Sequence, residues 1–172
     1  MGCGRGNESG GQSSKRGCVC EVVRSILEIQ NAATQNECSG CTTSCFLEPL
    51  GGIVSPARHS ADTRVFTLLT KSGCPFFSTF SSTEMECDDV CTSIYFRVED
   101  VFDSCCATLR VLIPLDDCKH PVQLLHDHGC EINMRKVCEV VHFAPSDSCI
   151  TVDLDCFCAV QCIADVNLGI CN

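Results

Sequence analysis

Cysteine constrains this chain more than any other residue, because 19 of its 172 residues are cysteine. That share is about the level at which small secreted chains use disulfides as a scaffold. A chain of this length can bury a hydrophobic core of its own, so it does not need disulfides merely to fold. The odd count leaves one thiol over even after complete internal pairing, which favours a bond between chains. The sequence therefore predicts a protein that cross-links to itself.

The rest of the composition narrows the environment and the partners. The first 16 residues are polar throughout and lack the apolar stretch of a signal peptide, so we expect none. No apolar run approaches the roughly 18 residues of a membrane helix, so we expect no membrane insertion. The formal charge of −10 disfavours nucleic acid as a partner. These features predict a chain made in a reducing cytosol, where its thiols meet oxidant only later or hold metal.

Apolar periodicity predicts the fold. Residues 1–17 are rich in glycine and serine and predict a flexible arm, followed by a single cysteine-rich β domain over 18–172. Helical spacing of apolar residues from Val19 predicts a short N-terminal helix to about Ala33. Strand patterns follow over 64–70, 74–80, 92–99, 105–113, 136–143 and 149–163, the first two joined as a hairpin, with a long surface loop over 114–135. We therefore predict an all-β fold, a two-sheet antiparallel sandwich.

Strand alternation divides the cysteines into two classes, since successive side chains point to opposite faces of a sheet. Those that alternate with the apolar positions are expected to be buried or bonded within the chain: Cys105, Cys156, Cys158 and Cys162. Those on polar faces or near the chain ends are candidates for bonds between subunits: Cys3, Cys18, Cys20, Cys106, Cys149 and Cys171.

Two other chemistries compete with cross-linking. A zinc-holding binding module is the alternative function, because one loop carries thiol and imidazole ligands at Cys118, His120, His126, His128 and Cys130. Their spacing matches no paired CxxC knuckles and could arise by chance, so we assign neither a metal nor a cofactor. An enzyme is not expected, since no nucleophile, base and oxyanion set can be named, and the CxxC at Cys38 and Cys41 follows a helix instead of starting one.

Four stretches, 18–27, 93–100, 105–112 and 149–163, resemble the CotY, CotZ and ExsY family of cysteine-rich spore coat and exosporium proteins. The resemblance implies a structural protein made in the mother-cell cytoplasm and deposited on the spore surface, in the outer coat or crust or in the exosporium basal layer. It also implies self-assembly into a hexamer-based, disulfide cross-linked two-dimensional lattice. Expected partners are copies of the chain and other spore coat or exosporium proteins. The glycine-rich arm over 1–17, the loop over 114–135 and the terminal Cys171 depart from the family pattern.

Overall fold

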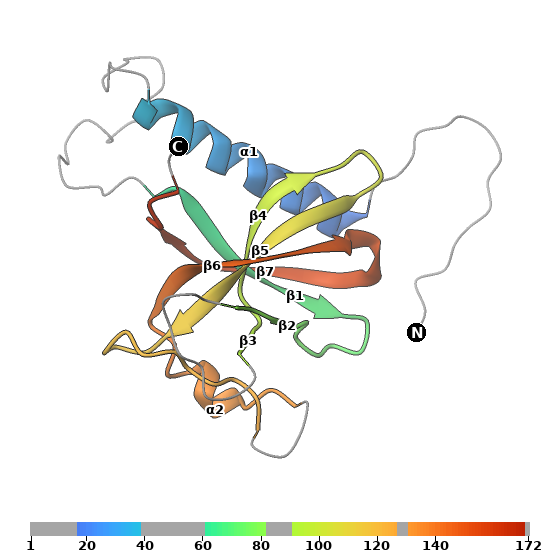
Figure 1. Ribbon diagram of the computed structural model, residues 1–172. Helices are drawn as coiled ribbons and strands as arrows, with labels where there is room; N and C mark the ends of the chain where they lie inside the picture. Colours follow the sequence, from blue (N-terminus) through green and yellow to red (C-terminus); the bar gives the residue numbers. More distant parts are fainter. Residues whose placement is uncertain (1–16, 39–60, 82–90, 127–130, 171–172) are drawn as a thin grey trace, which may run out of the picture.

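The computed structural model describes residues 17–38, 61–81, 91–126 and 131–170 (Figure 1). Its helices are α1 (Cys18–Cys38) and α2 (Met134–Val137). Its strands are β1 (Thr63–Thr70), β2 (Ser78–Thr79), β3 (Thr92–Ser93), β4 (Phe96–Val101), β5 (Cys106–Leu115), β6 (His142–Asp153) and β7 (Phe157–Val166), with a 3-10 turn, η2 (Leu154–Cys156), between the last two. Five strands form an antiparallel sheet in the order β6-β5-β4-β1-β7, and β2 pairs with β3 in a small second sheet. The predicted all-β class with two antiparallel sheets and an N-terminal helix is confirmed.

The large sheet is curled. Strands β6 and β7 lie on its two opposite edges, yet only the three residues of η2 separate them in the chain. Five flat strands would place the edges about 19 Å apart. The four residue steps from Asp153 to Phe157 can span at most about 14 Å. The sheet must therefore curl until its edges approach each other at η2, although β6 and β7 are not hydrogen-bonded neighbours.

Helix α1 covers one face of this sheet and completes the main core. Val19, Val23 and Ile26 recur at helical spacing and are buried against the sheet. The facing strand residues are Phe66, Leu68, Phe96, Val98, Leu109 and Val111. Each fully buried side chain of this size contributes about 1.5–3 kcal/mol by leaving water. The helix is therefore held to the sheet mainly by apolar burial.

The other face of the sheet is covered by the segment that follows β5, on the side opposite α1 (Figure 1). Val122 and Leu124 of this segment are buried against Leu112 of β5 and Tyr95, the residue before β4. Tyr95 also packs edge-on against Phe143, with 4.9 Å between ring centroids. The predicted surface loop thus forms one wall of a second core.

The predicted hairpin strand over 74–80 is only partly present, because the chain reverses there but only Ser78–Thr79 (β2) form a strand. The amide of Thr70 donates to the carbonyl of Cys74 at 2.9 Å, and Gly73 supplies the positive φ of 83° that the turn requires. Pairing then shrinks to an isolated bridge between Leu69 and Pro75. The amide of Phe76 still donates to the carbonyl of Leu68 at 2.8 Å, and beyond this residue the chain leaves β1 and β2 pairs with β3 instead.

The predicted strand over 136–143 is wrong. Residues Met134–Val137 form α2, capped by Asn133, whose side chain accepts a hydrogen bond from the amide of Arg135 at 3.1 Å. Strand β6 begins at His142 and runs through Pro145, where a strand break was expected. An edge strand tolerates proline because its outer amides need no partner.

The predicted arm over 1–17 lies outside the described residues except for Gly17, so the division into arm and single domain stays a prediction. Within the described ranges, no helix is long and apolar enough to cross a membrane.

Candidate functional site

One disulfide joins α1 to the turn before β5. Cys20 and Cys105 form this bond, with their Cα atoms 5.7 Å apart, and both side chains are buried. Assigning Cys20 to a bond between subunits was therefore wrong, because no neighbour can reach its sulfur. The burial of Cys20 could have been predicted from the helical pattern, since Cys20 lies three residues before Val23 on the buried face of α1.

Cys105 occupies a turn position that usually belongs to glycine. The β4–β5 turn runs from Phe102 to Cys105, with the Cys105 amide donating to the Phe102 carbonyl at 3.0 Å and Cys105 at φ 61°. The backbone of Cys105 also accepts a hydrogen bond from the Leu154 amide at 3.0 Å, which ties the turn to η2. A cysteine stands here because its sulfur bonds to α1, in spite of the unfavourable conformation.

The cysteines near the C-terminus are exposed, not buried. Cys156, Cys158 and Cys162 were expected to face the core, and all three side chains are at the surface. The expectation assumed one continuous strand, whereas η2 interrupts the chain. Asp153 stabilises this interruption by accepting a hydrogen bond from the Asp155 amide at 3.0 Å. Two register shifts in the β1–β7 pairing then change the alternation again, so parity counted from β6 fails along β7.

Most thiols that the structure describes are free and accessible. Nine cysteines in the described ranges are free, eight of them exposed and Cys106 half-buried: Cys18, Cys74, Cys106, Cys118, Cys138, Cys149, Cys156, Cys158 and Cys162. Cys91 is disulfide-bonded. Among the subunit-bond candidates, Cys18, Cys106 and Cys149 therefore keep free thiols, and Cys3 and Cys171 lie outside the described residues.

Three of these thiols gather around η2. Strand register places Cys106 opposite Asp153, and the Cys156 sulfur lies 3.8 Å from a carboxylate oxygen of Asp153. Cys18 begins α1 immediately after Gly17, whose backbone packs so closely on Asp155 that a Cβ atom there would meet its carboxylate at 2.8 Å. The start of α1, the start of β5 and η2 therefore meet at one end of the molecule.

Two further thiols join this end through Thr70, the last residue of β1. Thr70 pairs with Phe157 of β7, next to η2, and its carbonyl lies 3.0 Å from the Cys158 sulfur. The Thr70 hydroxyl donates to the carbonyl of Cys74 at 3.0 Å. We call this region, defined by Cys18, Cys74, Cys106, Cys156 and Cys158, the thiol-rich end. It holds five of the nine free thiols that the structure describes.

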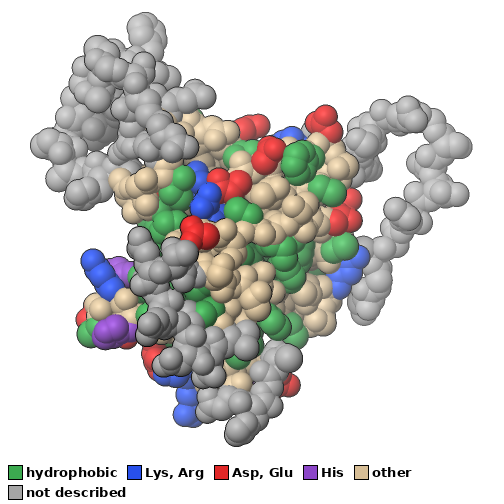
Figure 2. All heavy atoms as spheres, in the orientation of Figure 1, with side chains coloured by type: hydrophobic (Ala, Val, Ile, Leu, Met, Phe, Trp, Pro, Cys, Tyr) green, Lys and Arg blue, Asp and Glu red, His purple; other side chains and the backbone are tan. Residues whose placement is uncertain are grey.

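The remaining free thiols lie elsewhere. Cys149 is on β6 and Cys162 on β7, the two edge strands. Cys138 follows α2, and Cys118 lies in the turn after β5. Figure 2 shows that hydrophobic side chains, a class that includes cysteine in that view, reach the surface between scattered charged groups. The accessible thiols of the described residues thus lie on several elements, with five of the nine at one end.

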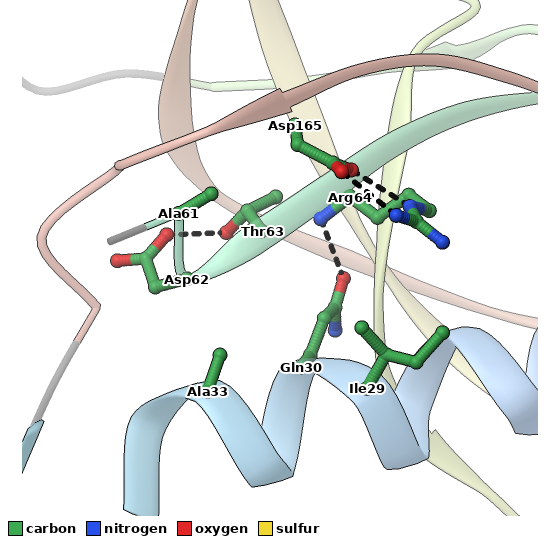
Figure 3. Close-up of a pocket in the computed structure, with 8 residues that line it drawn as sticks. All are labelled: Ile29, Gln30, Ala33, Ala61, Asp62, Thr63, Arg64 and Asp165. Carbon is green, nitrogen blue, oxygen red and sulfur yellow. Dashed lines mark hydrogen bonds and ion pairs between the residues drawn. The ribbon is translucent and has the colours of Figure 1, made fainter. Parts of the chain in front are cut away.

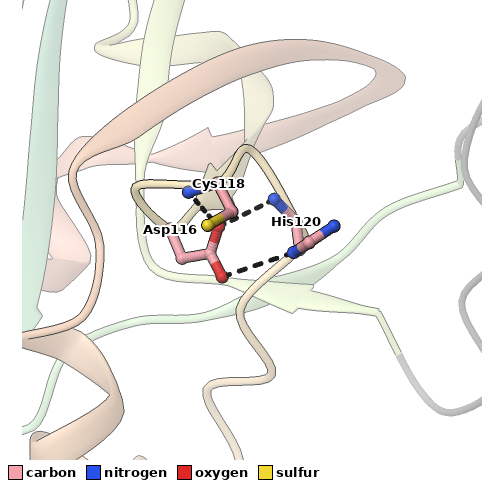
Figure 4. Close-up of side chains that lie close together, drawn as sticks. All are labelled: Asp116, Cys118 and His120. Atoms are coloured by element: carbon pink, nitrogen blue, oxygen red, sulfur yellow. Dashed lines mark hydrogen bonds and ion pairs between the residues drawn. The ribbon is translucent and has the colours of Figure 1, made fainter.

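The proposed zinc loop is only partly brought together. Asp116, Cys118 and His120 lie close together in the turn after β5, with their ligand atoms within 4.8 Å of one another (Figure 4). His126 does not belong to this group, and residues 128 and 130 lie outside the described ranges. The set of ligands predicted from the sequence did not include Asp116, which alternates with Cys118 and His120 along the chain. A carboxylate two residues before Cys118 was the feature that could have identified this third ligand.

A small pocket lies between α1 and the start of β1 (Figure 3). Gln30 is buried there, donates to the carbonyl of Val98 at 2.8 Å and accepts from the amide of Arg64 at 3.1 Å. Arg64 also forms a two-pronged ion pair with Asp165 at 2.7 Å, and this hydrogen bond lowers the pKa of Asp165. The pocket holds about 50 Å³, whereas sites for organic ligands usually hold several hundred. Its polar groups link α1 to the sheet.

Comparisons with known proteins identify the family of the chain. The family model for Spore coat protein Z matches residues 1–165. The chain belongs to this family. It is 33% identical over 146 residues to Spore coat protein Z of Bacillus subtilis (strain 168), covering 85% of this chain and 88% of that protein. No solved structure matches the chain. The resemblance predicted from the sequence is confirmed, and family membership supports a structural role in the spore coat and a location at the spore surface.

Proposed function

We propose that this chain is a subunit that packs with copies of itself into a two-dimensional layer of the spore surface, which disulfides between subunits then lock. Family membership supports the coarser part, a structural protein of the spore coat. The observation that carries the finer part is the thiol-rich end, where five free thiols gather while Cys20 and Cys105 are bonded inside the core. A structural role also agrees with a family of coat proteins better than catalysis does.

The accessibility of the thiols supports bonds between chains. A disulfide requires Cα atoms about 4.4–6.8 Å apart, so both partners must lie where two surfaces can touch. Of the nine free thiols that the structure describes, eight are exposed and one is half-buried. A buried free cysteine would act as a small apolar side chain, whereas these are available to a neighbour.

The directions of the thiols support a network instead of a dimer. A subunit with one cross-linking site forms dimers, one with two forms chains, and a layer needs contacts in at least three directions. The thiol-rich end supplies one direction. Cys149 on the β6 edge and Cys162 on the β7 edge supply two more. This arrangement suits a sheet of subunits, including the hexamer-based lattice that the family resemblance implies.

Noncovalent packing comes first in this proposal. Thiol–disulfide exchange joins only sulfurs already held near bonding geometry, so contacts between copies select which of many pairs form. Within the part of the chain that the structure describes, β6 and β7 are the edge strands of the sheet, and edge strands present backbone groups for such contacts. The layer would assemble with other spore coat proteins, and cross-linking would then make it resistant to detergent.

The test uses the full chain in two variants. The first replaces the five cysteines of the thiol-rich end with serine, and the matched control replaces Cys118 and Cys138, which lie outside that end and off the two edge strands. Serine at exposed positions should leave folding intact. After air oxidation, wild-type protein should form large species that survive hot detergent and dissolve only with reductant, as seen on nonreducing gels and by electron microscopy.

The variants separate the outcomes. The thiol-rich-end variant should lose most of its detergent-resistant species, and the control should keep a larger share. Mixing ¹⁴N- and ¹⁵N-labelled subunits before oxidation identifies the bonds between chains by mass spectrometry, because only those give peptide pairs of mixed isotope. Monomeric oxidised wild-type protein would refute self-assembly. Unchanged cross-linking in the thiol-rich-end variant would refute its role and leave the other thiols responsible.

A further inference from the structure

The turn after β5 places three different metal ligands together, far from the thiol-rich end. Asp116, Cys118 and His120 contribute a carboxylate, a thiol and an imidazole, all within 4.8 Å of one another. Strand β5 has ten residues and begins at Cys106, so its two ends lie about 30 Å apart. The turn is therefore separate from the region assigned to cross-linking.

Backbone hydrogen bonds fix this turn before any ligand arrives. The amide of Asp116 donates to the carbonyl of His120 at 3.0 Å, and the amide of Lys119 donates to the carbonyl of Asp116 at 3.0 Å. An isolated bridge between Leu115 and Pro121 closes the base. Lys119 takes a positive φ of 64°, which turns the chain so that residues 118 and 120 both lie near Asp116.

The Asp116 carboxylate divides its two oxygens between structure and a free position. One oxygen accepts hydrogen bonds from the amides of Cys118 at 2.8 Å and His120 at 2.9 Å. The hydrogen bond from the His120 amide, with that from Cys118, lowers the pKa of Asp116, so the carboxylate is charged at neutral pH. The other oxygen lies 3.7 Å from Nδ1 of His120 (Figure 4).

We propose that Asp116, Cys118 and His120 bind one zinc-class divalent cation. Zinc takes carboxylate oxygen and imidazole nitrogen at about 2.0–2.2 Å and thiolate sulfur at about 2.3 Å, so tetrahedral oxygen and nitrogen ligands lie about 3.3–3.5 Å apart and each lies about 3.5–3.7 Å from the sulfur. The oxygen–nitrogen separation of 3.7 Å is therefore about 0.2 Å longer than a bound ion requires. The remaining separations, at most 4.8 Å, need a closure of about 1 Å by exposed side chains. Binding releases the thiol proton of Cys118, and water completes the fourth position.

The chemistry of the three ligands sets the class of metal. A thiolate with an imidazole favours borderline and soft ions over magnesium or calcium, which prefer oxygen ligands only. The site is open, because the exposed turn supplies three protein ligands and leaves one position to water. The proposal goes beyond lattice formation and does not depend on it, because the turn belongs to a single chain.

Protection of one thiol tests the site in the presence of many others. The full chain is reduced with a phosphine, incubated with zinc chloride, and treated briefly with iodoacetamide, and mass spectrometry measures alkylation of each cysteine. Zinc should slow alkylation of Cys118 by about tenfold or more, while exposed Cys138 on the α2 side serves as the internal reference. Magnesium chloride at the same concentration should have no effect.

Two variants decide whether the three residues act together. Asp116→Asn keeps an oxygen that accepts the two amide hydrogen bonds while removing the charged ligand, and His120→Ala removes the imidazole. Each should restore alkylation of Cys118 in zinc to nearly the metal-free rate. His142→Ala, at another exposed histidine, should retain protection. Absence of zinc protection in the wild-type chain, or equal protection in the Asp116 and His120 variants, would overturn the proposal.

Discussion

Removing the disulfide between Cys20 and Cys105 should destabilise the fold far more than removing any exposed thiol. The bond closes a loop with a sequence separation of 85 residues. In the chain-entropy model, releasing a loop of that size gives the unfolded chain about 4.6 kcal/mol of additional stability at 25 °C. For a chain of this length, that change lowers the melting temperature by about 9–18 °C. We therefore expect the double variant Cys20→Ala, Cys105→Ala to melt well below the wild type.

The assay must keep subunits from cross-linking while they unfold. Alkylating the exposed thiols with iodoacetamide achieves this and leaves the buried bond intact, and far-UV circular dichroism then follows thermal unfolding. The matched control replaces the neighbouring cysteines, Cys18 and Cys106, which leaves the bond in place and should cost less than about 1 kcal/mol. A double variant that melts within about 3 °C of the alkylated wild type would refute the reasoning.

Two other predictions concern the polar contacts that join the start of β1 to its surroundings. Burial by itself would raise the pKa of Asp62, but hydrogen bonds to its carboxylate and the charge of Arg97 lower this pKa overall. The charged carboxylate therefore stabilises the fold above the ordinary pKa of 3.8, and this stabilisation is lost as pH falls through the lower pKa of the folded state. Asp62→Asn should therefore lower the free energy of unfolding, measured with urea at pH 7, by about 1–3 kcal/mol. The difference in free energy from wild type should narrow only below about pH 4, and a difference that is constant with pH would contradict this. Gln30→Leu should cost about 2–4 kcal/mol, because it leaves the carbonyl of Val98 and the amide of Arg64 without their partner, and a change below about 1 kcal/mol in the same urea assay would show that water replaces both bonds.

Periodicity within a single element was a reliable guide to the fold. The apolar spacing from Val19 onward predicted α1, and the alternation along 105–113 predicted most of β5. The points at which a strand ends or gives way to a helix could not be predicted from periodicity. The departure of the chain from β1 after Phe76 depends on the pairing of β2 with β3, and α2 depends on the side-chain cap at Asn133. Both are decided by hydrogen bonds to partners that periodicity does not name.

The candidate site shows the same limit more sharply. The cysteines of the C-terminal stretch were assigned by counting residues from one apolar position, which is valid only while the strand continues. The turn η2 at Leu154–Cys156 ended the count, and a short turn with an aspartate cap has no apolar pattern of its own. The burial of Cys20, in contrast, followed from helical spacing and was available from the sequence. Its bond to Cys105 was not, because disulfide connectivity depends on which distant elements meet.

The division of cysteines between core and surface separates folding from cross-linking. The sulfur of Cys20 is buried with α1 against the sheet, so reductant and oxidant reach it only when the helix lifts from the core. Four of the five thiols of the thiol-rich end are exposed to both in the folded state, and the fifth, Cys106, is half-buried. Disulfides between subunits can therefore form and break under conditions that leave the internal bond unchanged. In the proposed layer, mild reductant would release folded subunits, and their reassembly would depend on surface contacts alone. A chain whose cysteines were all needed for its core could not be assembled and dissolved in this way.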